Sequence, residues 1–253
     1  MKVSIITVVY NGEATIASAI TSVRDQDYSD IEYIIVDGAS QDRTVEIVRE
    51  FGPVVSVLIS EPDRGLYDAM NKGIARATGD VIGILNADDL YAGTDIISSV
   101  VQQLQESGAD SLVGDLVYVK PDQTDNIVRY YRSQNFQLKR FEVGDMPPHP
   151  TFFARRNLYE QHGNFNTEYR IVADFDLMLR FLYKAGASFT YLPKVMVKMR
   201  TGGLSDSGWS SKVRLNQEIK RSLAANGLPA SSLKIYSKYF RKIWQLVRRP
   251  AKS

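Results

Sequence analysis

The first hundred residues alternate between short apolar runs and segments in which apolar residues recur every three or four positions. The runs are rich in β-branched residues and bounded by polar ones, which is typical of buried strands. They predict strands at residues 3–9, 31–36, 54–59 and 81–85. The periodic segments predict helices at residues 13–24, after Thr44 and at 67–77. Alternation at this spacing indicates βαβ units, so we expect an α/β fold whose mostly parallel sheet is flanked by helices.

The rest of the chain is less regular. It predicts a helix at 96–105, a strand at 111–119 and late strands at 187–192 and 195–199. Residues 120–144 lack a clean period and are expected to be irregular, with a short hairpin; a proline-rich loop at 146–150 then leads into a short strand. Further on, helical spacing places Phe175, Met178, Leu179 and Leu182 on one inward face. From Trp209 onward the pattern predicts helices.

Composition excludes several classes of site. The 253 residues carry a formal charge of +2, no cysteine and only two histidines, His149 and His162. Disulfides, thiolate metal sites and a multi-histidine zinc site are therefore not expected. The apolar N-terminus lacks the basic region and cleavage site of a signal peptide, and no run of about 20 apolar residues exists to span a membrane. We expect a cytoplasmic protein.

The predicted strand at 81–85 stops abruptly in Asn86, Asp88 and Asp89. In open α/β sheets, ligands bind outside the carboxyl ends of the strands. Closely spaced carboxylates repel, so a divalent cation between them is favourable, and such cations usually bridge to substrate phosphates. The alternative is that Asp88 and Asp89 cap a following helix.

Polar residues also follow the other predicted strands. Thr7, Tyr10 and Asn11 belong to the end of the first strand, Asp37 to the second, and Glu61, Asp63 and Arg64 to the third. An acidic residue after the second strand suits hydrogen bonds from a ribose or a base. No G-x-G-x-x-G follows the first strand and no P-loop motif occurs, so phosphate would be held largely by a cation.

Several ordered motifs make the sequence resemble family 2 glycosyltransferases of the GT-A fold. They are residues 4–11 (SIITVVYN), 35–44 (IVDGASQDRT) and 85–89 (LNADD), while 60–73 (SEPDRGLYDAMNKG) resembles bacterial members that build cell-surface polysaccharides. The resemblance covers roughly residues 2–205. It implies a GT-A domain at 1–205, with a nucleotide-sugar-binding half (1–100) and an acceptor-binding, catalytic half (101–205), followed by a basic amphipathic tail (206–253).

The resemblance also implies roles for residues of the first half. The D-x-D element of the family falls on Asn86-Ala87-Asp88, so Asp88 would be the ligand of Mg²⁺ or Mn²⁺. Asn86 replaces the first aspartate and could still bind a ribose or phosphate, which leaves Asp89 open as a second ligand. Asp37 would contact the nucleobase, with Thr7, Tyr10 and Asp63 lining the nucleoside pocket. The structural alternatives are a buried hydroxyl for Thr7, core packing for Tyr10, and turn capping for Asp37 and Asp63.

In the second half, the resemblance implies that Asp174 is the catalytic base. Inverting glycosyl transfer needs one group to take the proton of the acceptor hydroxyl, and an ionised carboxylate at a helix start suits that role. The alternative for Asp174 is an N-cap; Asp176 is a weaker candidate. His149 would face the acceptor or the diphosphate, or be an ordinary surface histidine. Arg200 opens a flexible loop (200–205) able to close over the donor diphosphate. The Gln-x-x-Arg-Trp element of processive members is absent, so one sugar is expected per encounter.

The end of the chain predicts a membrane contact. Residues 234–249 combine a face containing Trp244 with many lysines and arginines and no acidic residue, which is typical of helices on anionic bilayers. The alternative is a helix docked on the domain.

We therefore expect a metal-dependent inverting glycosyltransferase, peripheral on the inner face of the cell membrane. It would transfer a single sugar from a nucleotide sugar, expected to be UDP-linked, to a glycan or polyprenyl-linked acceptor in surface-polysaccharide synthesis, with no nucleic-acid partner. The rivals are a non-catalytic nucleotide-sugar-binding scaffold subunit and a sugar-nucleotide pyrophosphorylase, although the latter would need a glycine-rich basic loop after the first strand.

Overall fold

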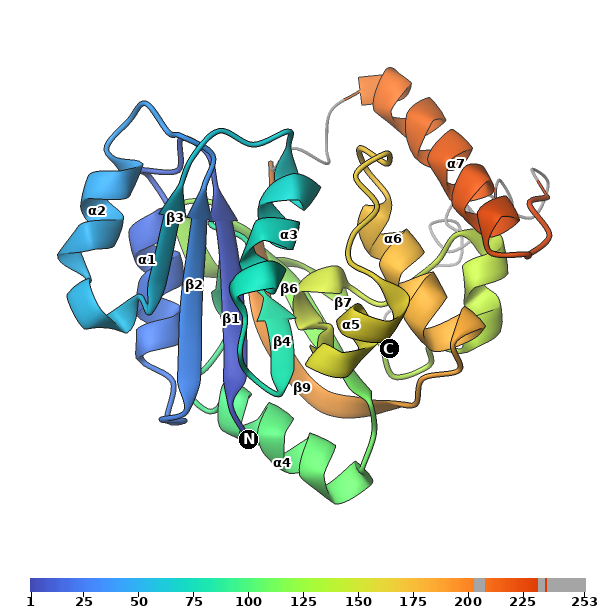
Figure 1. Ribbon diagram of the computed structural model, residues 1–253, viewed down its shortest axis with the longest axis horizontal. Coiled ribbons are helices and arrows are strands. Elements are labelled where there is room, and N and C mark those ends of the chain that lie inside the picture. Colours follow the sequence, from blue (N-terminus) through green and yellow to red (C-terminus); the bar gives the residue numbers. More distant parts are fainter. Residues whose placement is uncertain (203–207, 232–234, 236–253) are drawn as a thin grey trace, which may run out of the picture.

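A nine-stranded mixed sheet forms the centre of the part of the chain that the structure, a computed structural model, describes: residues 1–202, 208–231 and 235 (Figure 1). The strands follow the order β3-β2-β1-β4-β8-β6-β9-β5, and β7 pairs with β6 beside this path. Their bounds are β1 (Val3–Val9), β2 (Ile31–Asp37), β3 (Val57–Ser60), β4 (Val81–Ile84), β5 (Asp89–Tyr91), β6 (Ser111–Lys120), β7 (Gln123–Tyr131), β8 (Phe153–Arg155) and β9 (Phe189–Arg200).

Helices cover both faces of this sheet. The helices are α1 (Ile16–Arg24), α2 (Thr44–Glu50), α3 (Leu66–Arg76), α4 (Ile96–Ser107), α5 (Arg156–His162), α6 (Ala173–Met178) and α7 (Gly208–Ala225). The described residues also form short 3₁₀ segments, η1 (Gly52–Val54), η2 (Leu138–Val143) and η3 (His149–Thr151), and the π-helical segment η4 (Leu179–Lys184) continues α6.

Successive residues of β1 supply two separate cores because side chains alternate across a strand. Ile5 packs in the cluster that contains the buried residues of α1, α2 and α4. Ile6 packs in the other cluster, with α3, α5, α6 and α7. The whole of β1 is buried, as its continuous apolar run predicts. The predicted α/β class and the mixed sheet flanked by helices are confirmed.

The first half of the sheet is parallel and the second half is mixed. β1 pairs in parallel with β2 and β4, and β2 with β3. β8 joins the two halves, antiparallel to both β4 and β6. The carboxyl ends of β1, β2 and β4 therefore lie along one edge, which is where the predicted donor and metal residues follow.

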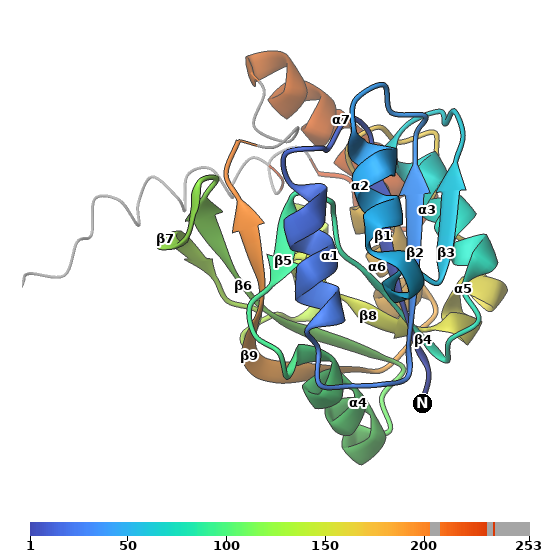
Figure 2. The ribbon, with the colours of Figure 1, turned by 90° about the vertical axis from the view of Figure 1, so that its left-hand side faces the viewer.

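The structure differs from the predicted elements in three places. Residues 54–56 are not strand, because the η1 turn delays β3 to Val57. The two predicted late strands are one, β9, whose register against β6 skips from Leu192 to Val195. A bulge at this point accommodates Pro193, which has no N–H for the ladder. β7 pairs with β6 in a hairpin longer than expected, at the margin of the molecule (Figure 2).

The predicted tail begins with α7, which packs against the domain. Ile219 and Leu223 of α7 are buried in the same cluster as Phe175 of α6. The basic amphipathic segment predicted at 234–249 lies outside the described residues, apart from Ile235. Among the described residues, no helix has both the length and the apolar character required to cross a membrane.

Candidate active site

Three of the predicted donor residues meet at the turn that follows β2. A Cβ placed on Gly38 would lie 2.4 Å from Asp63 Oδ2 and 3.5 Å from Tyr10 Cδ2, so the glycine lets both side chains approach. Tyr10 is 63% exposed and offers an open aromatic face there. Asp37 is fully buried, and its carboxylate accepts hydrogen bonds from the Ser60 hydroxyl (2.7 Å) and the Ser40 N–H (3.2 and 3.3 Å). These contacts fix the turn, and contact of Asp37 with a base stays a prediction.

Thr7 is not at this turn's surface. It has no exposed area, and its hydroxyl lies 3.0 Å from the Tyr33 hydroxyl inside the layer between the sheet and its helices. The contacts of Thr7 are those of the structural alternative, a buried strand hydroxyl.

The residues after β4 form a compact polar cluster. Asn86 Nδ2 donates to Asp89 Oδ2 (3.0 Å) and lies 3.3 Å from His149 Nε2. Asp89 is fully buried and opens β5, which pairs with β9, while the next helix begins only at Ile96. The alternative that Asp88 and Asp89 cap a following helix is therefore wrong. The side chain of Asp88 is half-buried beside this cluster.

The cluster has the donor set of a hard-cation site. Asn86 Oδ1 and Asp89 Oδ1 are buried and have no hydrogen-bond partner among the described residues. Burial, followed by the charge of Asp88, raises the pKa of Asp89 to about 8 despite the hydrogen bond from Asn86. Unpartnered buried oxygens are costly, and amide and carboxylate oxygens are what Mg²⁺ and Mn²⁺ accept. The residues thus fit a divalent cation, although the described ranges hold no group of three or more His, Cys, Asp or Glu side chains suited to a metal.

Arg200 contacts the backbone of this cluster. Its guanidinium donates to the Asp88 carbonyl (2.7 Å), the Pro121 carbonyl (3.1 Å) and the Ser18 hydroxyl (3.0 Å). It is the last residue of β9 and not part of a loop. Residues 203–205 of the predicted closing loop lie outside the described residues. In this arrangement the guanidinium fixes the backbone of Asp88, and contact with a diphosphate stays a prediction.

On the other side of the cluster, His149 connects Asn86 with Asp174. His149 belongs to η3, and its Nδ1 lies 3.3 Å from Asp174 Oδ2. A neutral imidazole protonated at Nδ1 would donate that proton to the Asp174 carboxylate. Its Nε2 would then accept a hydrogen bond from the Asn86 amide. Asp174 lies in the first turn of α6, and its side chain is 13% exposed. The structure thus brings together Asn86, His149 and Asp174.

Burial dominates the charge states of this pair. It raises the pKa of Asp174, an effect that His149 and hydrogen bonds from the Phe175 N–H and the Tyr67 hydroxyl oppose. Burial lowers the pKa of His149, although Asp174 and Asp88 raise it. A carboxylate with a raised pKa in a shielded place is a better proton acceptor than one in water. The N-cap alternative does not fit, because Val172 holds the N-cap position of α6.

A small cavity lies under His149 and Asp174. Its volume is about 20 Å³, enough for roughly one water. The walls are otherwise mostly apolar: Met70, Ile84, Phe152, Tyr159, Phe165, Leu177 and Met178. The pair therefore adjoins a small cavity whose walls are mostly apolar.

No pattern in the sequence indicated Tyr67, which is a neighbour of Asp174 in the structure. Its hydroxyl donates to the Ile171 carbonyl (2.8 Å) and lies 3.4 Å from Asp174 Oδ1. Tyr67 lies in the first turn of α3 and is buried. It is 107 residues from Asp174 in sequence, so no local pattern could pair them.

Comparison with known proteins identifies the class that this fold and site represent. The sequence profile described as Glycosyl transferase family 2 matches residues 4–163, more than half of the chain. An uncharacterized glycosyltransferase of Mycobacterium tuberculosis is 33% identical over 180 residues, 70% of this chain and 68% of the relative. A PGL/p-HBAD biosynthesis glycosyltransferase of Mycobacterium bovis is 30% identical over 215 residues, 81% of this chain and 79% of the relative. The chain belongs to glycosyl transferase family 2.

Solved structures share the fold. Staphylococcus aureus TarS 1–349 in complex with UDP-GlcNAc superposes with a TM-score of 0.70 at 18% identity, covering 97% of this chain and 73% of that one. The mannosyltransferase PcManGT of Pyrobaculum calidifontis, in complex with GDP-Man and Mn²⁺, gives a TM-score of 0.65 at 22% identity, covering 88% and 63%. The expected glycosyltransferase class is confirmed, and neither the scaffold nor the pyrophosphorylase alternative is favoured.

Proposed function

We propose that this glycosyltransferase moves a single sugar, with inversion, from a UDP-sugar to a hydroxyl of a glycan or lipid-linked acceptor. The observation that carries the proposal is the chain of contacts from Asn86 through His149 to Asp174. It links a cluster suited to a cation-bound diphosphate with a shielded carboxylate suited to a base. The corner formed by Tyr10, Asp37 and Asp63 supports nucleoside binding at the same edge of the sheet.

Asp174 acts as the base in this proposal. As the acceptor oxygen attacks the anomeric carbon, its proton passes to the Asp174 carboxylate and the bond from that carbon to the UDP oxygen breaks. His149 orients the carboxylate and helps to keep it ionised, because it opposes the effect of burial on the pKa of Asp174. The apolar floor of the cavity limits attack by water in place of the acceptor.

Asp88, with Asn86 and Asp89, would hold Mg²⁺ or Mn²⁺. A divalent cation bound there supplies charge neutralisation for the departing diphosphate. Asn86 Oδ1 and Asp89 Oδ1, which have no hydrogen-bond partner within the described part of the chain, support the assignment. PcManGT, which shares the fold, is known in complex with GDP-Man and Mn²⁺, and this is consistent with it.

The acceptor side is proposed from charge and composition. The lysines and arginines at 234–249 would attract an anionic bilayer, so the enzyme would work on the cytoplasmic surface of a membrane that carries a polyprenyl-linked acceptor.

The test is a binding measurement followed by a turnover measurement. UDP, UDP-GlcNAc and GDP-mannose, each with and without Mn²⁺, should raise the melting temperature by mass action if they bind. Asp174→Asn should lower release of UDP from the bound donor by about 100-fold or more while UDP binding is retained. Asp30→Asn, an exposed aspartate away from the site, is the matched control. Binding without any effect of Asp174→Asn would overturn the assigned base, and no binding of any nucleotide would overturn the proposed function.

A further inference from the structure

Helix α7 contributes a carboxylate to the segment that leads into α6. Glu218 accepts hydrogen bonds from three successive backbone N–H groups, those of Arg170 (3.2 Å), Ile171 (2.9 Å) and Val172 (3.3 Å). The first N–H groups of a helix and its approach lack partners within the helix, and Val172 at the N-cap has no polar side chain to supply one. Glu218 supplies from a distant helix what the local sequence lacks.

The peptide units of Ile171 connect Glu218 to the site. The Ile171 N–H is held by Glu218, and the Ile171 carbonyl accepts a hydrogen bond from Tyr67 (2.8 Å). The same Tyr67 hydroxyl lies 3.4 Å from Asp174 Oδ1. The backbone three residues before Asp174 is therefore fixed from opposite sides by α7 and α3.

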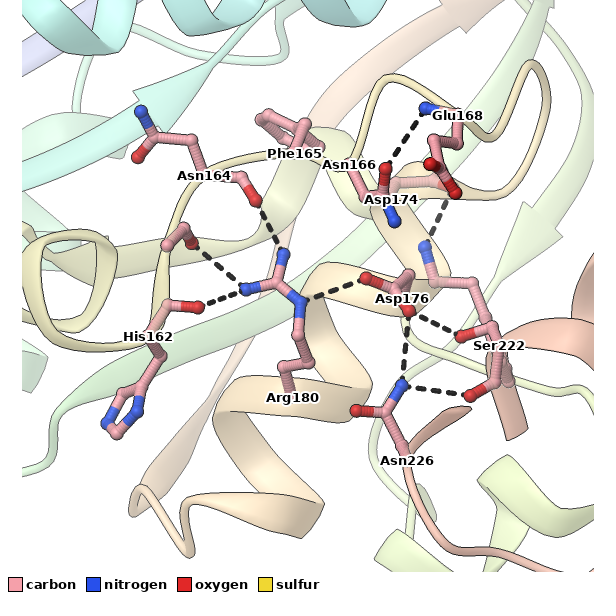
Figure 3. A network of polar contacts seen from close by, with 12 residues as sticks. His162, Asn164, Phe165, Asn166, Glu168, Asp174, Asp176, Arg180, Ser222 and Asn226 are labelled. Atoms are coloured by element: carbon pink, nitrogen blue, oxygen red, sulfur yellow. Dashed lines mark hydrogen bonds and ion pairs between the residues drawn. The ribbon is translucent and has the colours of Figure 1, made fainter. Parts of the chain in front are cut away.

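A second set of contacts holds Asp176, which lies in the same first turn of α6 as Asp174. Asp176 accepts hydrogen bonds from Ser222 (2.7 Å) and Asn226 (3.1 Å) of the C-terminal segment, and from Arg180 Nε (2.9 Å). Figure 3 shows the Arg180 guanidinium between Asp176 and the carbonyl oxygens of residues 162–164, at the end of α5. Asp174 and Asp176 thus have different partners. Asp176 contacts Ser222 of α7, and Asp174 contacts His149.

The loop before α6 is held to α7 as well. Arg221 forms an ion pair with Glu168 and lies 5.4 Å from the centre of the Tyr169 ring. With Glu218, these contacts tie residues 168–172 to one face of α7. The matched family profile ends at residue 163, so the contacts involve a part of the chain that the profile does not cover.

We propose that Glu218 is a positioning residue for the reaction, acting through the Ile171 backbone to hold Asp174 against His149 and the acceptor. The inference rests on the proposed role of Asp174. Misplacement of a reacting group by about 1 Å can cost up to about 100-fold in rate, so fixing this turn affects catalysis more than donor binding.

The experiment compares Glu218→Ala, Glu218→Gln and Gln217→Ala in the full chain. The readouts are kcat and KM for release of UDP from UDP-GlcNAc with Mn²⁺, and hydrogen exchange at the amides of residues 170–172. Gln217 is the exposed neighbour on the same helix and serves as the matched control. Val100→Ala, in the core on the opposite side of the sheet, serves as a control for lost stability alone.

In Glu218→Ala we expect kcat to fall roughly tenfold or more, KM for the donor to stay within about twofold, and exchange at 170–172 to accelerate. Glu218→Gln keeps one oxygen able to accept from Ile171 and Val172, so it should restore most of kcat. Gln217→Ala and Val100→Ala should keep the wild-type kcat at a temperature where they are folded. The proposal fails if Glu218→Ala exchanges faster at 170–172 but keeps kcat, or if Val100→Ala loses kcat equally. Absent turnover in the wild type would instead count against the proposed function.

Discussion

Replacement of Asp176 by alanine should destabilise the protein much more than loss of a surface carboxylate. Asp176 is 3% exposed, and the side chain of its ion-pair partner Arg180 is 17% exposed. The variant removes the acceptor for Arg180, Ser222 and Asn226 at once. The guanidinium would then be left largely buried without its anion.

The structure sets the size of the effect. Removing one partner of a buried ion pair costs about 3–5 kcal/mol. Arg180 keeps hydrogen bonds to the carbonyl groups of Gly163 and Asn164, which places the loss at the lower end, about 3 kcal/mol. In a domain of this length, that loss corresponds to a fall in Tm of roughly 6–12 °C.

Urea unfolding at pH 7, followed by circular dichroism, measures this loss directly. Glu160→Ala is the control, because its ion pair with Arg156 is exposed on both sides and should change stability by less than about 0.5 kcal/mol. Adding Arg180→Met to Asp176→Ala should recover part of the loss, since the unpaired charge is then gone. A loss below about 1 kcal/mol for Asp176→Ala, or one equal to that of Glu160→Ala, would refute the assignment of Asp176 as a buried anchor.

Three further substitutions test other parts of the structure. Burial raises the pKa of Glu32, but hydrogen bonds from its neighbours outweigh this effect and lower the pKa from 4.5 to about 2. The shift corresponds to about 3 kcal/mol of stability. This stability is present above pH 4.5 and is lost as the pH falls toward 2. Glu32→Gln should therefore make the free energy of unfolding fall less steeply as the pH is lowered. Urea titrations at several pH values measure this, and the same pH dependence in variant and wild type would show that the reasoning is wrong. Gly38→Ala should displace Asp63 and weaken UDP binding about tenfold with little effect on folding; calorimetry that finds wild-type affinity would contradict the role of this corner. Without metal, Asn86→Asp should lower Tm, because Asp89 loses a hydrogen-bond donor and gains a neighbour of like charge. Mn²⁺ should then raise the Tm of this variant more than that of the wild type. An equal rise in both proteins would count against the cation site.

Local pattern was enough to predict the half of the fold in which neighbouring elements pair. The strand that ends before Asn86 and the parallel strands beside it follow from continuous apolar runs, and their carboxyl ends bring Tyr10 and Asp63 to one turn as expected. Long-range pairing was not visible in the same way. Asp89 looks like a helix cap in sequence, yet it is in a strand because β9, more than a hundred residues later, pairs with it.

In the candidate site, too, the sequence indicated single residues but not the long-range contacts between them. Resemblance to a family indicated Asp174 and His149 separately, and the structure adds that they lie 3.3 Å apart and that Asn86 contacts the second ring nitrogen. Tyr67 and Glu218 carry no local signal, because their contacts with the backbone before α6 depend on how α3 and α7 pack. Arg200 was expected at a diphosphate, but its hydrogen bonds are to the protein itself.

The contacts of α7 also bear on the order in which the protein can be completed during synthesis. The strands that make up the parallel half of the sheet lie within the first 84 residues, and Asp174 follows 90 positions later. The groups that fix the backbone before Asp174 and the side chain of Asp176 are at positions 218, 222 and 226. On a ribosome, the edge of the sheet proposed to bind the nucleotide can therefore form long before the turn of α6 that carries Asp174 is held in place. The turn of α6 that carries Asp174 can reach its final packing only after Asn226 has left the exit tunnel.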